Sequence, residues 1–377
     1  MVGSFQFGTA IGLSTAASDI LGFHAASAGF LYLFQQRVFT GQVSYSYNRL
    51  LPNFGITAGR GYSERGGFNR YIYDRGPSDT DTYLQTGYRE LNTFVGGNMG
   101  LPVVRSGKHS ADAGVSYRWT RLTNLDESDR PIDPSAPTTS LPEVGDVAQL
   151  NMRVSYSSTG DGASRFTYGA ERGRSAVVSM GVLDERLGGD YGDLQVNAAY
   201  VEAIPMPWRG HQSLELTARG GASAGGLRRR GAFCVGNFGA GPSVLGGADV
   251  VLAMLNRTGF GTNGCSLLRG YGTAAAAGRY FGILSAEYRI PIVDIDRGLG
   301  TAPFFFQRVG LVPFVDWGNA WSDPIRPRDL LLAGGASLAF TFRVGFVESA
   351  TLLLQYTHGF DKDLGLDTFR AVIGSAF

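Results

Sequence analysis

The sequence predicts an all-β fold, a transmembrane, antiparallel up-and-down β-barrel. Three observations lead to this prediction. Glycine supplies 55 of the 377 residues, about twice its usual share, and aromatic residues supply 12%. Apolar and polar residues alternate with a period of two through most of the chain. Because glycine is costly inside helices, and no stretch of about 18 residues is free of polar and charged side chains, helical globular and helical membrane folds are disfavoured.

The composition also narrows the class of protein. The formal net charge is +1, so no overall positive field attracts nucleic acid, and no nucleic-acid partner is expected. The many aromatic and branched residues argue against disorder, and the glycines lack the period of three found in collagen. Only two cysteines are present, which excludes a disulfide-dense scaffold and a multi-cysteine zinc site. No metal and no cofactor are expected.

The alternation marks each expected strand. Between residues 111 and 119, every odd position is apolar, and Asp112 and Arg118 lie among the even positions. Such a pattern gives a strand one apolar and one polar face. Fifteen segments qualify: 2–14, 22–34, 40–49, 53–64, 80–101, 109–121, 147–157, 164–182, 190–205, 211–224, 279–292, 304–318, 332–344, 350–360 and 368–377. Because single-chain bacterial barrels have an even number of strands, we expect sixteen, with the first strand poorly defined here or located before Met1.

A soluble β-sandwich would also alternate, so the choice of a barrel depends on strand length and connectors. The expected strands are about ten residues or longer, whereas strands of soluble proteins are most often about 5–6 residues. Short and long connectors also alternate along the chain. A membrane barrel shows the same alternation, because short turns lie at its periplasmic end and longer loops at its outer end. The long connectors lie near 65–80, 122–146, 225–278 and 319–331. Aromatic residues near strand ends would form interfacial girdles: Tyr45, Tyr47, Trp119, Tyr156, Trp208 and Trp317.

The connector over 225–278 is the longest and holds both cysteines, Cys234 and Cys265. Loops of this length are usually functional. A disulfide between the two cysteines would close a loop of about 32 residues and stabilise it by about 3–4 kcal/mol in the chain-entropy model. The alternative is two unpaired thiols. The stretch 247–256 is expected to form a short helix within this loop.

Three motifs follow one another after this loop. The loop ends in Leu268-Arg269-Gly270-Tyr271, and the next two segments read ILSAEYRIPI over 283–292 and FVDWGNAW over 314–321. The chain ends in Phe377. This ordered set resembles the C-terminal barrel of the BamA/TamA-like surface-antigen superfamily of outer-membrane assembly and translocation proteins. The specific motifs cover about residues 265–325, and the first 224 residues agree in pattern alone.

The resemblance implies that the long loop folds into the barrel lumen and carries an Arg-Gly-Tyr tip. Alternation places Glu287 and Asp316 on the inward faces of two neighbouring strands, where their like charges repel unless a cation intervenes. Arg269 offers a planar fork of donors to both, as the matching arginine does in the family. Gly270 would permit a close turn, and Tyr271 would pack against the wall. The alternative is a solvated loop arginine.

The last strand carries a second signal. Phe369 and Phe377 lie on the face expected to contact lipid, together with Ala371 and Ile373. A terminal aromatic residue resembles the signal by which the barrel-assembly machinery recognises its substrates. The alternative is an ordinary closing edge strand.

Patterns typical of enzymes occur without their usual surroundings. Residues 221–225 fit G-x-S-x-G, and residues 259–264 fit G-x-G-x-x-G. The first pattern needs a strand–turn–helix with a catalytic triad, and the second needs a βαβ unit. The four histidines show no metal-binding spacing. The sequence therefore predicts a protein that is not an enzyme.

The resemblance implies insertion or translocation of proteins at the bacterial outer membrane. We expect residues 1–377 to form a single barrel domain, with no POTRA repeat or other soluble domain. The expected partners are outer-membrane lipids, lipopolysaccharide, the barrel-assembly machinery, unfolded outer-membrane proteins and periplasmic domains. The alternative is a pore, or a membrane anchor for a periplasmic or surface module.

Overall fold

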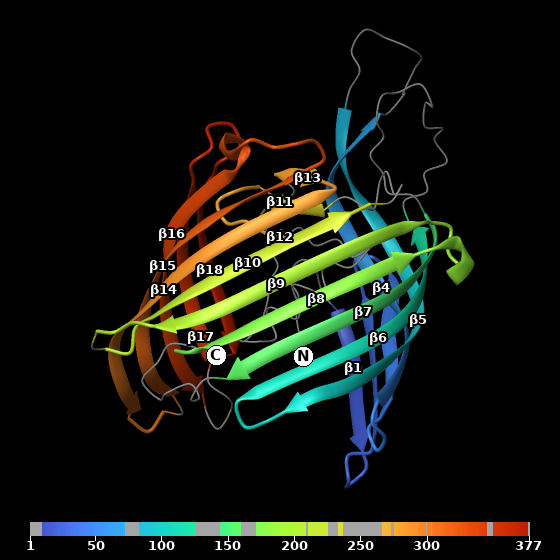
Figure 1. Cartoon of the computed structure of the whole chain (residues 1–377), viewed down its shortest axis with the longest axis horizontal. Helices are drawn as coiled ribbons and strands as arrows, with labels where there is room; N and C mark the ends of the chain where they lie inside the picture. The colour runs from blue at the N-terminus through green and yellow to red at the C-terminus, as the bar shows by residue number, and fades with distance from the viewer. Residues whose placement is uncertain are drawn as a thin grey trace.

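The computed structural model describes residues 10–71, 83–125, 144–159, 171–208, 210–224, 233–236, 266–272, 275–298, 300–302, 304–344 and 350–375. Fifteen strands form one sheet in which each strand pairs antiparallel with its neighbours along the chain. The sheet is strongly tilted and curves into the wall of a barrel (Figure 1). The prediction of an all-β, up-and-down fold is confirmed. Within the described ranges, no helix is long and apolar enough to cross a membrane.

Each of the fifteen expected strands has a counterpart in this sheet. They are β1 (Ala10–Ser18), β2 (His24–Leu33), β3 (Val38–Tyr47), β4 (Asn53–Tyr71), β5 (Tyr83–Arg105), β6 (His109–Asn124), β7 (Gly145–Thr159), β8 (Gly173–Leu183), β9 (Asp193–Pro205), β10 (Ser213–Ser223), β14 (Tyr280–Gly298), β15 (Phe304–Trp321), β16 (Leu331–Val344), β17 (Ala350–Gly359) and β18 (Asp367–Ser375). Short 3₁₀ helices, η2 (Glu185–Leu187) and η3 (Pro327–Asp329), lie in two of the connectors.

Some boundaries differ from those expected. The first strand was expected to end at residue 14 but continues to Ser18. The strand expected over 279–292 continues to Gly298, because shifts in register accommodate the extra residues of β14 opposite β15. The described part of the strand expected over 164–182 begins at Gly173. A sixteenth strand stays a prediction, since residues 1–9 lie outside the described ranges.

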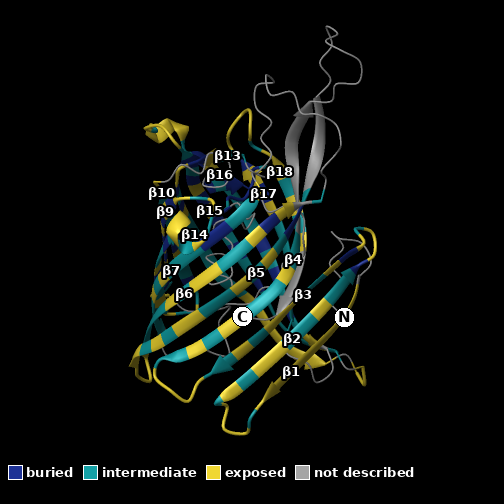
Figure 2. Ribbon diagram, turned by 90° about the vertical axis from the view of Figure 1, so that its right-hand side faces the viewer, coloured by how far each residue is buried: buried dark blue, intermediate teal, exposed yellow. Residues whose placement is uncertain are grey.

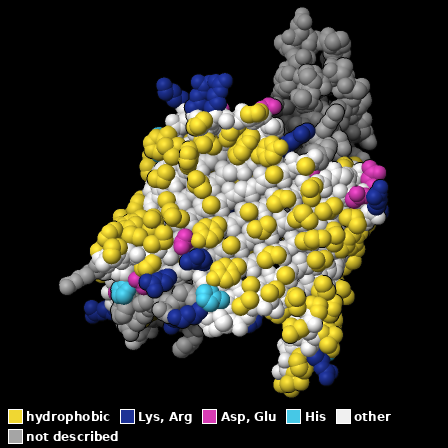
Figure 3. Space-filling view, in the orientation of Figure 1, with side chains coloured by type: hydrophobic (Ala, Val, Ile, Leu, Met, Phe, Trp, Pro, Cys, Tyr) yellow, Lys and Arg dark blue, Asp and Glu magenta, His cyan; other side chains and the backbone are white. Residues whose placement is uncertain are grey.

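The strands expose one face and cover the other. On β15, Val315 and Trp317 are 50% and 42% exposed, whereas Phe314 and Asp316 are 4% and 2% exposed. Figure 2 shows similar alternation along many strands. On the face that Figure 3 shows, apolar side chains are spread over the outer surface of the wall. Because side chains alternate between faces, Asp316 is placed on the inner face by the same pattern that places Trp317 outside.

The long loop contributes a second, small sheet. Its strands are β11 (Phe233–Gly236), β12 (Ser266–Leu267) and β13 (Ala276–Gly278), with β11 in the centre. Side chains of this loop share one buried cluster with inward residues of the barrel wall. The cluster consists of Phe233, Val235, Leu268, Tyr271, Phe281, Ile283, Ala320, Leu331 and Ala333. The described residues of the loop therefore pack against the inner face of the wall. The helix expected over 247–256 lies outside the described residues.

The two ends of the sheet are β1 and β18. Among the described residues, no ladder joins these two strands. Every residue of β1 from Ile11 to Ser18 is exposed, although one face of the strand would be covered in a packed wall. The first hairpin, at the edge of the sheet near the N-terminus in Figure 2, is thus less well covered than β15.

Hydrogen exchange should reveal this difference in packing. We expect the amides of β1 to exchange at least about tenfold faster than those of β15, because exposed edge strands open at low free-energy cost. Mass spectrometry of peptides from the folded barrel measures both strands in one experiment. Equal protection of the amides of β1 and β15 from exchange would contradict the weaker packing of the edge strand β1.

Candidate functional site

The site is built on the inner face of two neighbouring strands. Asp316 of β15 lies directly opposite Ser285 of β14, and Phe314 lies opposite Glu287. The two carboxylates are therefore diagonal neighbours on one face. Both belong to strands in which every second side chain points into the lumen, so their separation is set by the ladder.

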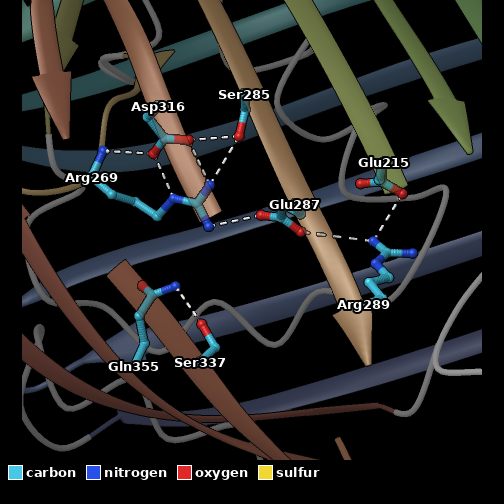
Figure 4. A network of polar contacts seen from close by, with 8 residues as sticks. All are labelled: Glu215, Arg269, Ser285, Glu287, Arg289, Asp316, Ser337 and Gln355. Carbon is cyan, nitrogen blue, oxygen red and sulfur yellow. Dashed lines mark hydrogen bonds and ion pairs between the residues drawn. The ribbon is translucent and has the colours of Figure 1, made fainter. Parts of the chain in front are cut away.

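Arg269, at the tip of the long loop, lies between these two carboxylates (Figure 4). Its Nε and Nη2 donate to Oδ2 and Oδ1 of Asp316 at 2.5 and 2.6 Å, which makes a bidentate ion pair. Its Nη1 donates to Oε1 of Glu287 at 2.7 Å. A second donor of Nη2 reaches Ser285 Oγ at 2.9 Å, and Ser285 in turn donates to Asp316 at 2.6 Å. The guanidinium also stacks on Phe314, with Cζ 3.5 Å from the ring centroid.

Little of this pair is open to solvent. The side chains of Arg269 and Asp316 are 10% and 3% exposed, and that of Glu287 is 25% exposed. Burial by itself lowers the pKa of the Arg269 guanidinium, but the charge of Glu287 and the charge-assisted hydrogen bonds of Asp316 outweigh it, so the pKa lies above its usual value. Removing one partner would leave the other buried and uncompensated, which is strongly destabilising.

The charge network continues toward the far end of β14. Arg289 Nη2 lies 2.8 Å from Glu215 of β10 and 3.9 Å from Glu287 (Figure 4). Glu215 and Glu287 face each other directly across the ladder. Like charges in this position repel, and Arg289 offsets the repulsion. Arg289, Glu215, Ser285 and Phe314 were not singled out from the sequence, although a step of two residues from Glu287 leads to both Ser285 and Arg289.

Gly270 and Tyr271 seat the tip against strands on its other side. Gly270 has a φ of +78°, and a Cβ there would lie 2.9 Å from the backbone nitrogen of Gly359. Its carbonyl accepts a hydrogen bond from the Leu366 amide at 2.9 Å. Tyr271 is fully buried, and its hydroxyl donates to the Leu332 carbonyl at 2.5 Å. The tip therefore contacts β14 and β15 through Arg269. It contacts β16, the end of β17 and the turn before β18 through Gly270 and Tyr271.

The remaining predicted residues lie elsewhere. Cys234 of β11 is disulfide-bonded, and Cys265, the other cysteine in the sequence, lies outside the described residues. Phe369 of β18 is 71% exposed. Phe377 lies outside the described residues.

The enzyme-like patterns do not assemble a catalytic group in the described part of the chain. Ser223 ends β10, and its hydroxyl donates to Asp193 at 2.8 Å. Gly225 and the 259–264 pattern lie outside the described residues. Three of the histidines bond to tyrosine or aspartate: His24 to Tyr45, His109 to Tyr156 and His358 to Asp367. Within the described ranges, no three His, Cys, Asp or Glu side chains gather as they would around a metal.

Two solved structures share the fold. The chain superposes on BamA from Haemophilus ducreyi lacking POTRA domains 1–3 with a TM-score of 0.59 and 14% identity, covering 98% of this chain and 67% of that one. It superposes on CdiB from Acinetobacter baumannii with a TM-score of 0.52 and 11% identity, covering 97% of this chain and 55% of that one. No family model and no curated protein sequence matches the chain. The fold is thus that of these barrels, and the chain spans little more than half of CdiB.

A double-mutant cycle tests the energetic link between Arg269 and Asp316. We expect Arg269→Ala and Asp316→Asn each to lower the free energy of unfolding by about 3–5 kcal/mol, because each leaves a buried charge or dipole unpaired. The double variant should lose less than the sum, by about 1–3 kcal/mol. Urea unfolding in detergent supplies all four values. Arg328→Ala is the control, because this 73% exposed side chain pairs with Asp329 at 3.8 Å and should change little.

Gly270→Ala tests the tight turn of the loop tip. A Cβ at residue 270 would meet the backbone of Gly359 in a left-handed conformation, so we expect a loss of at least about 1–2 kcal/mol in unfolding free energy. Gly272→Ala is the matched control, since the nearest heavy atom to its new Cβ is 3.8 Å away. Equal stability of the two variants would contradict the close packing of the tip.

Proposed function

We propose that this chain is an outer-membrane β-barrel of the BamA/TamA-like superfamily and acts in the insertion or translocation of proteins at the bacterial outer membrane. The observation that carries the proposal is the seat of Arg269 between Asp316 and Glu287 at the tip of a loop packed against the inner wall. Three motifs that resemble the family meet at this seat. The shared fold of BamA and CdiB supports the same reading.

The outer surface supports a location in a membrane. Large apolar side chains such as Ile56, Val154 and Val178 are 62%, 59% and 51% exposed on the outside of the wall. Water-soluble monomers rarely expose apolar surface so extensively. At the β9–β10 turn, Trp208 donates to the hydroxyl of Tyr288 at 2.7 Å. Such aromatic residues are typical of a membrane–water interface.

The geometry suggests that the loop tip and the sheet edge have different roles. The seated tip joins β14 and β15 to β16, β17 and the turn before β18, and so stiffens the C-terminal part of the wall. Among the described residues, β2 alone pairs with the exposed strand β1, so the other edge of β1 has no ladder partner there. An unfolded outer-membrane protein can add a strand to such an edge by β-augmentation. Unfolded outer-membrane proteins would thus be the substrates, and the barrel-assembly machinery and lipopolysaccharide would be further partners.

The second candidate is a pore, or a membrane anchor for a periplasmic or surface module. The hydrogen bonds of the Arg269 and Tyr271 side chains go to wall strands, as those of a purely structural brace in a pore or anchor would. In this case the loop tip would serve barrel stability alone, and the β1 edge would have no substrate.

Assisted folding in vesicles separates these two functions. Vesicles that contain the barrel should accelerate folding of a small unfolded outer-membrane protein by at least about tenfold over empty vesicles, equivalent to about 1.4 kcal/mol of barrier. The heat-dependent gel mobility of the folded substrate gives the rate. An unchanged rate would favour the pore or anchor.

Proline at the β1 edge tests the mechanism. In a strand, successive N–H groups point to opposite sides, so Thr15→Pro and Ala16→Pro each remove a different one. The variant that loses the N–H on the free edge keeps its pairing with β2 and should fold. We expect it to lose the acceleration, whereas Thr15→Ala should retain it. Full activity in both proline variants would contradict augmentation at β1.

A further inference from the structure

A group of polar and charged side chains interrupts the apolar outer surface near one end of the wall. It consists of His109, Tyr156, Arg174, Tyr200 and Glu202, which we call the polar patch. Outward direction follows from alternation, because Tyr156 is two residues from the exposed Val154, and Arg174 is four residues from the exposed Val178. Figure 3 shows a few charged side chains among the apolar ones on this face of the barrel.

The ladders hold the patch together across four strands. Arg174 of β8 lies opposite Glu202 of β9, and Ser158 of β7 lies opposite both Arg174 and His109 of β6. Two residues after Arg174 on β8, Ala176 lies opposite both Tyr156 of β7 and Tyr200 of β9. The patch is therefore one contiguous surface with a small side chain between two aromatic rings.

The contacts within the patch fix its groups but leave donors and acceptors available. The Tyr200 hydroxyl donates to Glu202 Oε2 at 2.9 Å, and His109 Nδ1 lies 2.9 Å from the Tyr156 hydroxyl with the rings stacked. Arg174 Nη2 lies 3.9 Å from Glu202 Oε1, longer than a hydrogen bond, and the Arg174 side chain is 57% exposed. A guanidinium in this state has donors for an anion, and a carboxylate oxygen of Glu202 beside it can accept from a cation.

The depth of the patch matches lipid headgroups. His109 is the first residue of β6, Arg174 is the second of β8, and Glu202 is three residues before the end of β9. At about 3.3 Å per residue, each lies within about 10 Å of a strand end. Trp208 and Tyr288 mark the same end of the barrel. At this depth a separated positive and negative charge faces the headgroups of one leaflet.

We propose that the polar patch binds a phospholipid whose headgroup carries both a phosphodiester and a primary ammonium, as in phosphatidylethanolamine. This inference rests on the proposed membrane location. Arg174 and His109 bind the phosphate oxygens, for which a guanidinium is suited. Glu202 accepts hydrogen bonds from the ammonium. The rings of Tyr156 and Tyr200, with Ala176 between them, contact the upper part of the acyl chains.

Native mass spectrometry of the folded barrel in detergent tests this site. The probes are dioctanoyl phosphatidylethanolamine, phosphatidylglycerol and phosphatidylcholine, with inorganic phosphate as a competitor. We expect wild type to bind phosphatidylethanolamine about tenfold more tightly than the other two, since phosphatidylglycerol has no ammonium and phosphatidylcholine has no N–H to donate. Displacement of the lipid by millimolar inorganic phosphate alone would indicate a simple phosphate site and overturn the headgroup assignment.

Two variants separate the parts of the site. Glu202→Gln should remove the preference for phosphatidylethanolamine while other lipids bind as before. Arg174→Gln should weaken all three lipids by about tenfold. Arg174→Lys retains the charge without the planar fork and should fall between Arg174→Gln and wild type, which covers the case in which Arg174→Gln fails to fold. Arg121→Gln is the matched control, because Arg121 pairs with Asp146 at 2.9 Å on the same outer surface at the opposite end of β6.

Failure of the lipid-binding proposal can be distinguished from failure of the proposed membrane location. Equal binding of the three lipids by wild type, or unchanged binding by Arg174→Gln and Glu202→Gln, would overturn the polar patch as a lipid site. Insertion into vesicles is followed separately by heat-dependent gel mobility. A chain that failed to insert would overturn the membrane location itself, whatever it bound in detergent.

Discussion

One buried ion pair organises this barrel: the guanidinium of Arg269 held by both oxygens of Asp316 and by Glu287. Two buried carboxylates on adjacent strands repel each other unless a cation lies between them, and a buried guanidinium is costly without anions beside it. Each side of the pair therefore depends on the other. Since Arg269 belongs to a loop of more than fifty residues, satisfying the pair also positions the tip of that loop, residues 268–271.

The same tip connects parts of the wall that are far apart in sequence. Arg269 contacts β14 and β15, Tyr271 contacts β16, and Gly270 contacts the turn before β18. An apolar cluster that includes Leu268 and Phe233 lies beside this seat, and the low exposure of Arg269 and Asp316 strengthens their charge-assisted hydrogen bonds. A buried ion pair adds little net stability over an apolar replacement, so we interpret its value here as specificity of the loop position. Within the described residues, the loop tip makes no such contact with the first hairpin, and β1 stays exposed from Ile11 to Ser18.

Much of this arrangement could be predicted from period-two alternation. It located all fifteen strands, and it placed Glu287 and Asp316 on the inner face, because the faces of a strand are set locally. The position of Arg269 came from a resemblance in motifs, since no local rule brings a loop tip to a wall residue 47 positions away. The role of Arg289 beside Glu215 was missed because it depends on the register between β10 and β14. The long loop separates these two strands in the sequence, so no local pattern sets that register. The bulged end of β14 was missed for a similar reason, as alternation breaks there.

The position of the loop tip can be measured directly by cross-linking. Cysteines at Gly272 and Leu366 would lie close together, because a Cβ at residue 272 is 3.8 Å from Cδ1 of Leu366. In the folded barrel, a short bifunctional maleimide should join them in most molecules. The same cysteine pair combined with Asp316→Asn should cross-link several-fold less, since Arg269 at the tip loses its bidentate carboxylate partner. Equal cross-linking with and without Asp316 would contradict the claim that this ion pair holds the loop in place.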